Sequence, residues 1–299
     1  MTTHSSTTIE RSAADPVLAS APHRVTKVTL VVRDLDRVAA FYRDVIGLAE
    51  TGREPGALSL GTDAATLVEL RHDAAARLRS PRDAGLFHTA FLLPERADLG
   101  AWLSQAAARG VSIQGASDHL VSEAIYLADP EGNGIEVYAD RPSAEWAWDG
   151  GSVRMATEAL DAQGLLASAA GRAWSGFPRG GTVGHVHLQV GAIAPAEAFY
   201  GGVLGFDVTA RYPGGSFFGS GGYHHQLAAN IWNSRSAPPR TEASTGLAEV
   251  ELAVDAETFE AVRTQAEGPA GEATRLTLRD PWNTAITLVA SPRGRPACS

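Results

Sequence analysis

Apolar and polar positions near the start of the chain predict a strand, a helix and further strands. Between Val38 and Val45 the apolar side chains recur every three or four residues, which is typical of an amphipathic helix. Gly47 is expected to end this helix. The predicted elements are a strand at 26–32, a helix at 36–48, and short strands at 57–60 and 66–71.

A second unit repeats this order. Its predicted elements are a strand at 87–93, a helix at 97–110 and a hairpin at 118–138. The third unit matches the first in register, because FYRDVIGL at 41–48 aligns with FYGGVLGF at 199–206. The fourth unit, at 247–289, repeats the second with a strand, a helix and two strands around the turn at 280–283. The chain therefore contains one strand–helix–strands unit four times.

These units divide the chain into five parts. They are a flexible tail at 1–22, a first pair of units at 23–140, a connector at 141–181, a second pair at 182–290 and a tail at 291–299. Structureless loops as long as the connector are uncommon inside compact domains, so we expect it to be folded, with a helix within 160–174.

Composition narrows the class of protein. The 299 residues suffice for two ordinary domains or one large one, and no apolar run is long enough to span a membrane. A formal charge of −9 argues against broad binding to nucleic-acid backbones. Cys298 is the only cysteine, which excludes an intrachain disulfide and a cysteine-rich metal site. The polar N-terminal stretch lacks the core of a signal peptide, so we expect a cytoplasmic protein with neither a nucleic-acid nor a membrane partner.

The hairpin at 118–138 carries the first candidate chemistry. Its turn, Asp129–Gly134, has the glycine and asparagine that positive φ angles favour. Glu136 and Tyr138 then lie on one face of the following strand, and His119 and Tyr126 are expected on the strand before the turn. A carboxylate in an apolar strand costs free energy unless it is paired or binds a metal. The alternative is an edge strand with Glu136 in water.

The histidines form a second group of candidates. His88 lies in an apolar strand, where it is either a satisfied buried residue or a ligand. His185 and His187 alternate with apolar residues and so face the same side, which indicates a polar cavity. The remaining isolated histidines are expected at the solvated surface: His4, His23 and His72.

Several motifs together resemble the vicinal oxygen chelate superfamily, which includes glyoxalase I, bleomycin-resistance proteins and extradiol dioxygenases. They are GLFHTAFLLP, DHLVSEAIYLADPEGNGIEVYADRP, GHVHL and GGYHHQL, and they are most similar to catechol-2,3-dioxygenase-like members. The resemblance covers residues 23–290. It implies an α+β fold in which four βαβββ modules pair into two curled-sheet cups.

The resemblance also implies a metal site with two histidines and one glutamate. This ligand set leaves adjacent positions open on Fe(II) for both catechol oxygens and O2. The first unit has Lys27 where a histidine is expected, and the fourth has Glu249 and Thr287 at the other two positions. Only the second and third units together supply a full set, which is His88, Glu136 and His185. We therefore predict a metal-bearing cup from units two and three, within one chain or across a dimer, and a metal-free cup from units one and four.

Roles for neighbouring residues follow from the same resemblance. His225 in the HHQLA segment is a candidate proton acceptor, because imidazole titrates near neutral pH. Tyr126 and His119 are candidate hydrogen-bond donors to substrate or to a ligand. His187 and His224 are assigned to the substrate pocket, with the His224 ring turned away from the metal.

The implied function is a non-haem Fe(II) extradiol ring-cleaving dioxygenase that acts on a catechol-type aromatic with O2. Mn(II) accepts the same ligands. A homodimer is one of the assemblies that we consider. Because this superfamily hosts many reactions on one scaffold, two alternatives remain. One is a metal-dependent isomerase, lyase or thiol transferase of the glyoxalase type. The other is a metal-free protein that binds drugs or metabolites.

Overall fold

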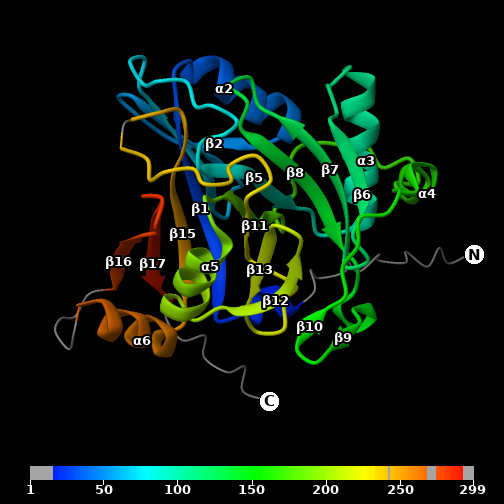
Figure 1. Ribbon diagram of the computed structural model, residues 1–299. Helices are drawn as coiled ribbons and strands as arrows, with labels where there is room; N and C mark the ends of the chain where they lie inside the picture. The colour runs from blue at the N-terminus through cyan, green and yellow to red at the C-terminus, as the bar shows by residue number, and fades with distance from the viewer. Residues whose placement is uncertain (1–15, 242, 268–273, 292–299) are drawn as a thin grey trace, which may run out of the picture.

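Two large curled sheets dominate the computed structural model, which describes residues 16–241, 243–267 and 274–291 (Figure 1). In the first sheet the strand order is β16 (Arg275–Arg279), β17 (Ala285–Ala290), β15 (Gly246–Val254), β1 (His23–Val32), β4 (Thr66–His72), β3 (Ala57–Gly61) and β2 (Ala49–Glu54). In the second sheet the order is β12 (Asp207–Tyr212), β13 (Gly215–Gly219), β14 (Leu227–Asn230), β11 (Thr182–Gln189), β5 (Gly85–Leu92), β8 (Gly134–Asp140), β7 (Ser122–Ala128) and β6 (Gly115–Asp118).

Each sheet combines units that are not consecutive in the sequence. Blue β1 of the first unit pairs antiparallel with orange β15 of the fourth (Figure 1). In the same way β11 of the third unit pairs antiparallel with β5 of the second. The predicted α+β fold with two cups is confirmed, and units two and three share a sheet within one chain. The predicted limits of the two pairs of units, at 140 and 182, therefore do not separate one sheet from the other, because each sheet contains strands from both pairs.

Helices cover the apolar faces of the sheets. In β1 the side chains of Val28, Leu30 and Val32 are fully buried, whereas Lys27 on the other face is partly exposed. The helices with their sheet contacts are α2 (Leu35–Phe41) on β3 and β4, α3 (Arg96–Ala108) on β8, α5 (Ile193–Ala196) on β14, and α6 (Ala256–Glu267) on β17. One cluster of buried apolar residues joins both sheets and these helices.

The repeated helix has the same irregularity in both copies. After α2 and α5 the chain continues as π-helix, at Tyr42–Ile46 and Glu197–Val203. Gly47 ends the first copy with a φ of 89°, as the sequence predicted. Tyr42 and Tyr200 occupy matching, fully buried positions. The Tyr200 hydroxyl donates to Asp280 at 2.7 Å, so this helix is tied to the turn of the fourth unit.

The connector is folded and contains the predicted helix. Its elements are a 3₁₀ turn at Ser143–Glu145, the two-stranded hairpin of β9 (Trp148–Asp149) and β10 (Ser152–Val153), and α4 (Ala162–Ser168). Helix α4 packs against α3 at Gly100, where an added Cβ would lie 2.3 Å from the Leu165 carbonyl oxygen. None of the described helices is long and apolar enough to cross a membrane.

Several predictions at this level were wrong. Residues 16–20 form α1 (Pro16–Ser20) rather than part of a flexible tail, because Leu18 packs into an apolar cluster. The tail predictions for 1–15 and 292–299 fall outside the described residues. Strand β2 was missed because its side chains are all exposed and carry no apolar pattern. His119 lies in the turn between β6 and β7, not on the strand itself.

His23 is buried rather than solvated. It begins β1 and stacks on Phe206 with ring centroids 4.0 Å apart. Its Nε2 atom donates to the Leu204 carbonyl oxygen at 2.8 Å. His23 therefore ties the first unit to the third, and burial lowers the pKa of its imidazole.

Candidate metal centre

Three neighbouring strands bring two histidines and a glutamate to one face of the second sheet. Ala90 on the central strand, β5, lies opposite His185 on β11 and opposite Glu136 on β8. His88 precedes Ala90 by two residues and so points to the same face. The small, fully buried side chain of Ala90 leaves room between them. The register of the paired strands thus brings three residues that are distant in sequence into one cluster.

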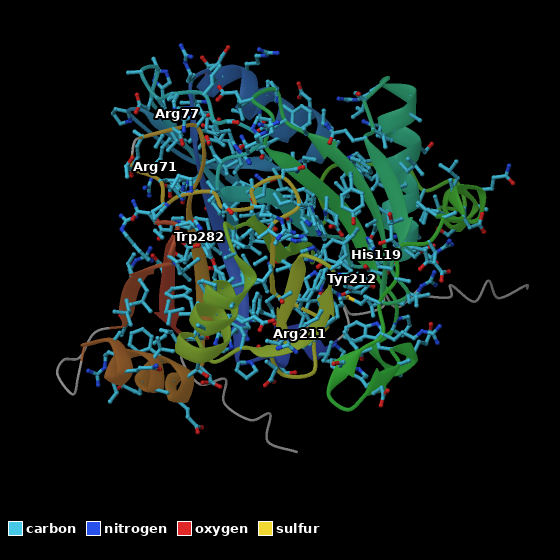
Figure 2. All side chains as sticks on the ribbon, in the orientation of Figure 1. Arg71, Arg77, His119, Arg211, Tyr212 and Trp282 are labelled. Carbon is cyan, nitrogen blue, oxygen red and sulfur yellow. The ribbon has the colours of Figure 1, made fainter. Side chains whose placement is uncertain are left out.

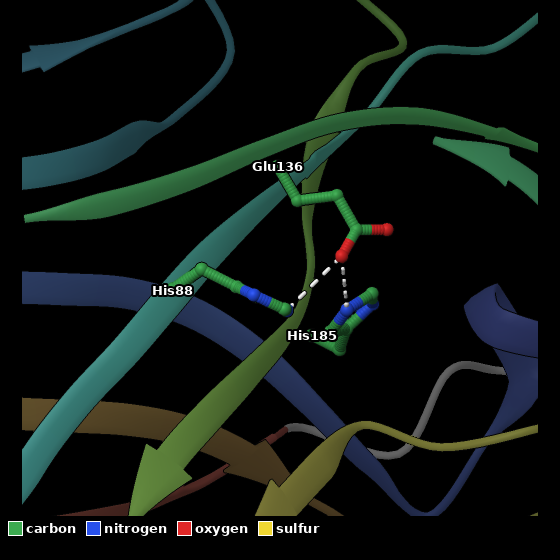
Figure 3. Close-up of side chains that lie close together, drawn as sticks. All are labelled: His88, Glu136 and His185. Atoms are coloured by element: carbon green, nitrogen blue, oxygen red, sulfur yellow. Dashed lines mark ion pairs between the residues drawn. The ribbon is translucent and has the colours of Figure 1, made fainter. Parts of the chain in front are cut away.

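The nitrogens of both histidines converge on one carboxylate oxygen (Figure 3). Glu136 Oε2 lies 3.0 Å from His88 Nε2 and 3.3 Å from His185 Nε2. One potential ligand atom from each residue lies within 4.8 Å of the other two. All three side chains are buried, with exposed fractions of 6% for His88 and 2% for each of the others.

The charges of this cluster suit a cation. Burial alone raises the pKa of the Glu136 carboxyl, but attraction and hydrogen bonds from His185 and His88 outweigh it, and the pKa lies well below its ordinary value. Burial is also the main effect on His185 and lowers the pKa of its imidazole. A lowered pKa favours the neutral form of the His185 imidazole, which is the form that binds a metal. Its Nδ1 atom is buried with no hydrogen-bond partner.

A cavity of about 300 Å³ opens onto the cluster. It is lined by the three clustered residues and by a wall of large apolar and aromatic side chains: Phe87, Val121, Met155, Tyr212, Phe217 and Trp232. His119 and Tyr212, both labelled in Figure 2, come from different repeats, yet both line this cavity. The Tyr212 hydroxyl donates to the carbonyl of Met155, so the connector closes one side.

His119 and Tyr126 form a hydrogen-bonded pair in the cavity wall. His119 Nδ1 donates to the Ala156 carbonyl oxygen at 2.7 Å, and its Nε2 atom lies 2.6 Å from the Tyr126 hydroxyl. Tyr126 lies opposite Glu136 across the β7–β8 pair. Burial, with the nearby Glu136 charge, raises the pKa of Tyr126 well above its ordinary value, so the phenol keeps its proton.

His225 and His187 line the cavity from the third unit. Burial and the surrounding histidines lower the pKa of each imidazole well below its ordinary value, so both are neutral near pH 7. His187 Nε2 accepts a hydrogen bond from the Asn230 amide at 3.0 Å. His225 lies against His185 with ring centroids 4.3 Å apart, so it is close to the metal cluster.

His224 does not line the cavity, contrary to its assignment to the substrate pocket. Its side chain is fully buried and lies behind His225, in the segment that precedes β14. It joins His225 to Asp140, a residue that sequence reasoning missed. A signal existed, since Glu136, Tyr138 and Asp140 follow each other at the two-residue period of β8. The aromatic wall had no comparable signal, because its members come from separate units.

Two ion-paired residues and a hydrogen-bonded threonine occupy the matching positions of the first sheet. Lys27 Nζ, at the position of His185, lies 3.0 Å from Glu69 and 3.9 Å from Glu251. Glu249, at the position of His88, lies 3.0 Å from Arg275. Thr287, at the position of Glu136, shares a hydrogen bond with Thr277. The first cup thus carries opposite charges in contact where the second carries the candidate ligands.

The protein consists of two sheets built from repeated βαβββ units. The second sheet presents a buried His-Glu-His cluster to an aromatic cavity, and this arrangement defines a candidate metalloenzyme. The sequence model of the glyoxalase/bleomycin resistance protein/dioxygenase superfamily matches residues 24–137 and 182–287, and this chain belongs to that superfamily.

Relatives at the sequence level are dioxygenases. The chain is 42% identical over 224 residues to catechol-2,3-dioxygenase of Bacillus subtilis (strain 168), across 73% of this chain and 78% of that protein. It is 30% identical over 125 residues to biphenyl-2,3-diol 1,2-dioxygenase 3 of Rhodococcus globerulus, across 39% of this chain and 63% of that protein. These relatives imply a metal cofactor, and the clustered residues fit one.

Solved structures share the fold. Glyoxalase I from Zea mays superposes with a TM-score of 0.52 at 15% identity, across 92% of this chain and 95% of that chain. The predicted superfamily is therefore confirmed by both sequence and architecture.

Proposed function

We propose that this protein is an extradiol ring-cleaving dioxygenase whose metal is held by His88, Glu136 and His185. The observation that carries the proposal is the convergence of two imidazole nitrogens and one carboxylate oxygen in a buried cluster at the end of an aromatic cavity. The dioxygenase relatives support the same reaction class.

The metal we propose is Fe(II), with Mn(II) as the substitute that accepts the same donors. Two nitrogens and one oxygen form the ligand set of non-haem iron oxygenases. When bound, the ion supplies open coordination positions for substrate and O2 and a route for electrons between them.

The surrounding side chains bind and orient the aromatic substrate. His225 is neutral and close to His185, so it is placed to accept a proton from a catechol hydroxyl. Tyr126, held by His119, stays protonated and presents a phenol beside Glu136. His187 is held by Asn230 and forms part of the polar floor.

The cavity wall favours an uncharged catechol with an apolar substituent. None of the described residues that line the cavity is a lysine or an arginine. A carboxylate on the substrate would therefore be buried without a cationic partner, which is costly. Phe87, Phe217 and Trp232 instead provide faces for an aromatic or aliphatic group.

Oxygen consumption with defined catechols tests this function. Purified protein is stripped of metal with a chelator, reloaded with Fe(II) or Mn(II), and mixed with catechol, 2,3-dihydroxybiphenyl or 3,4-dihydroxybenzoate in an oxygen electrode. We expect O2 uptake and a yellow ring-cleavage product, with 3,4-dihydroxybenzoate the poorest substrate. Metal-dependent turnover of another substrate without O2 uptake would instead indicate a glyoxalase-type reaction, and absence of metal binding would indicate a binding protein.

A further inference from the structure

A buried chain of hydrogen bonds runs from the cavity to Asp140 at the end of β8. His225 Nδ1 lies 2.8 Å from His224 Nδ1, and His224 Nε2 lies 2.9 Å from Asp140 Oδ1. The other oxygen of Asp140 accepts from the Tyr223 hydroxyl at 2.9 Å. Tyr223 in turn accepts from the Tyr138 hydroxyl at 2.8 Å. We call Asp140, His224 and His225 the Asp140 chain.

Packing holds the side chains of Asp140, His224 and His225 in one arrangement. His224 has no exposed surface and packs between Trp146 and Tyr223, with ring centroids 5.0 Å and 4.1 Å away. Because both Asp140 oxygens have partners, rotation of the carboxylate would break a hydrogen bond. Water is excluded at His224, so its ring nitrogens depend on Asp140 and His225.

The hydrogen bonds also determine where the protons lie. A carboxylate only accepts, so the proton shared by Asp140 and His224 belongs to His224 Nε2. An imidazole that carries its one proton on Nε2 has a bare Nδ1, which can only accept. His225 must therefore donate from its own Nδ1, and its Nε2 atom is the bare nitrogen that remains for the cavity.

We propose that Asp140 is a positioning residue that sets the tautomer of His225 through His224, so that His225 Nε2 is free to accept a proton from the substrate. The catalytic consequence rests on the proposed dioxygenase function, whereas the tautomer itself does not. Without the acceptor at Asp140, His224 would carry its proton on Nδ1 and donate to His225. The proton of His225 would then move to Nε2, and the cavity nitrogen could no longer accept.

Nitrogen-15 NMR of histidine-labelled, full-length protein measures the tautomer directly. Spectra are recorded metal-free and with diamagnetic Zn(II), and a His225→Gln variant assigns the resonances. In the wild type we expect the proton of His225 on Nδ1, and in Asp140→Leu on Nε2. Asp140→Asn retains an acceptor oxygen and should restore the wild-type pattern. Tyr223→Phe is the matched control, because it removes a hydrogen bond to Asp140 but leaves the His224 contact intact.

Two results would overturn the proposal. One is a wild-type His225 that carries its proton on Nε2, as it would beside a doubly protonated His224. The other is an Asp140→Leu protein that keeps the proton on Nδ1. Should Asp140→Leu fail to fold, His224→Phe removes the same acceptor from His225 and is expected to give the Nε2 tautomer.

Kinetics supply an independent readout in the iron-loaded enzyme. We expect Asp140→Leu to lower kcat at least tenfold with KM unchanged, and by no more than the factor of about 10²–10⁴ that a proton-transfer group contributes in full. The double variant Asp140→Leu/His225→Ala should be no slower than His225→Ala alone, because Asp140 acts through His225. Additive losses in kcat in the double variant would contradict the proposal that Asp140 acts through His225. If the wild type consumes no O2 with any catechol, the proposed function fails, while the NMR result still decides the tautomer.

Discussion

His185 Nε2 lies 3.3 Å from Glu136 Oε2, although His185 belongs to the third repeat and Glu136 to the second. The candidate metal centre therefore exists only where these two repeats meet. Pairing of β11 with β5, and of β5 with β8, brings the two side chains to either side of Ala90.

Replacement of His185 by alanine should abolish metal binding and turnover, because two donors cannot hold the ion in this geometry. Metal content per chain, measured by mass spectrometry, and O2 uptake both test this. Lys27→Met is the matched control, since Lys27 has the corresponding place in the other cup. The ligand assignment is wrong if His185→Ala retains stoichiometric metal.

His225→Ala should keep its metal but lose about 10²-fold or more in kcat, since general acid–base groups contribute about 10²–10⁴. His72→Ala, at an exposed position on β4, should leave the rate unchanged. Single-turnover absorbance with catechol in air separates the chemical step from binding. Full activity of His225→Ala would remove this residue from the mechanism.

Trp232→Ala should raise the KM for 2,3-dihydroxybiphenyl about tenfold, equivalent to about 1.4 kcal/mol of lost binding, and change the KM for catechol itself less. Trp232 contacts Phe87 and His187 with ring centroids 5.5 Å and 5.4 Å away, so it forms part of the cavity wall. Trp148→Ala is the control, because Trp148 is similarly exposed but lies outside the cavity. Equal KM changes for both catechols would contradict a role in substrate selection.

Acidification should destabilise the protein partly through His23. Because burial lowers the pKa of His23 in the folded state, the unfolded state binds more protons below about pH 6.5. The stability contributed by neutral His23 is thus present above the unfolded pKa and decreases as the pH falls through it. Urea unfolding at pH 7.5 and 5.5 measures the difference.

His23→Gln tests the source of this pH dependence. Glutamine keeps a donor for the Leu204 carbonyl but does not titrate. The variant should therefore lose less stability than the wild type between the two pH values. An identical loss in both proteins would mean that other groups account for the whole effect.

Local patterns in the sequence determined the elements, the fourfold repeat and the candidate ligands. The two-residue period of strands placed Glu136 and Tyr138 on one face, and the resemblance to the superfamily implied a metal set shared by units two and three. The inferences about strands and helices depend only on neighbours within a few residues along the chain. The exposed β2 and the buried His23 were misjudged because the local pattern does not report what packs over a residue.

Tertiary structure decided that units two and three pair within a single chain, through β5 and β11. It also decided the surroundings of the cluster. Met155 from the connector and Trp232 from the third unit line the cavity, and Asp140 at the end of β8 reaches His225 through His224. Strand pairing and side-chain packing act between residues that are far apart in sequence, so no local pattern could determine these contacts.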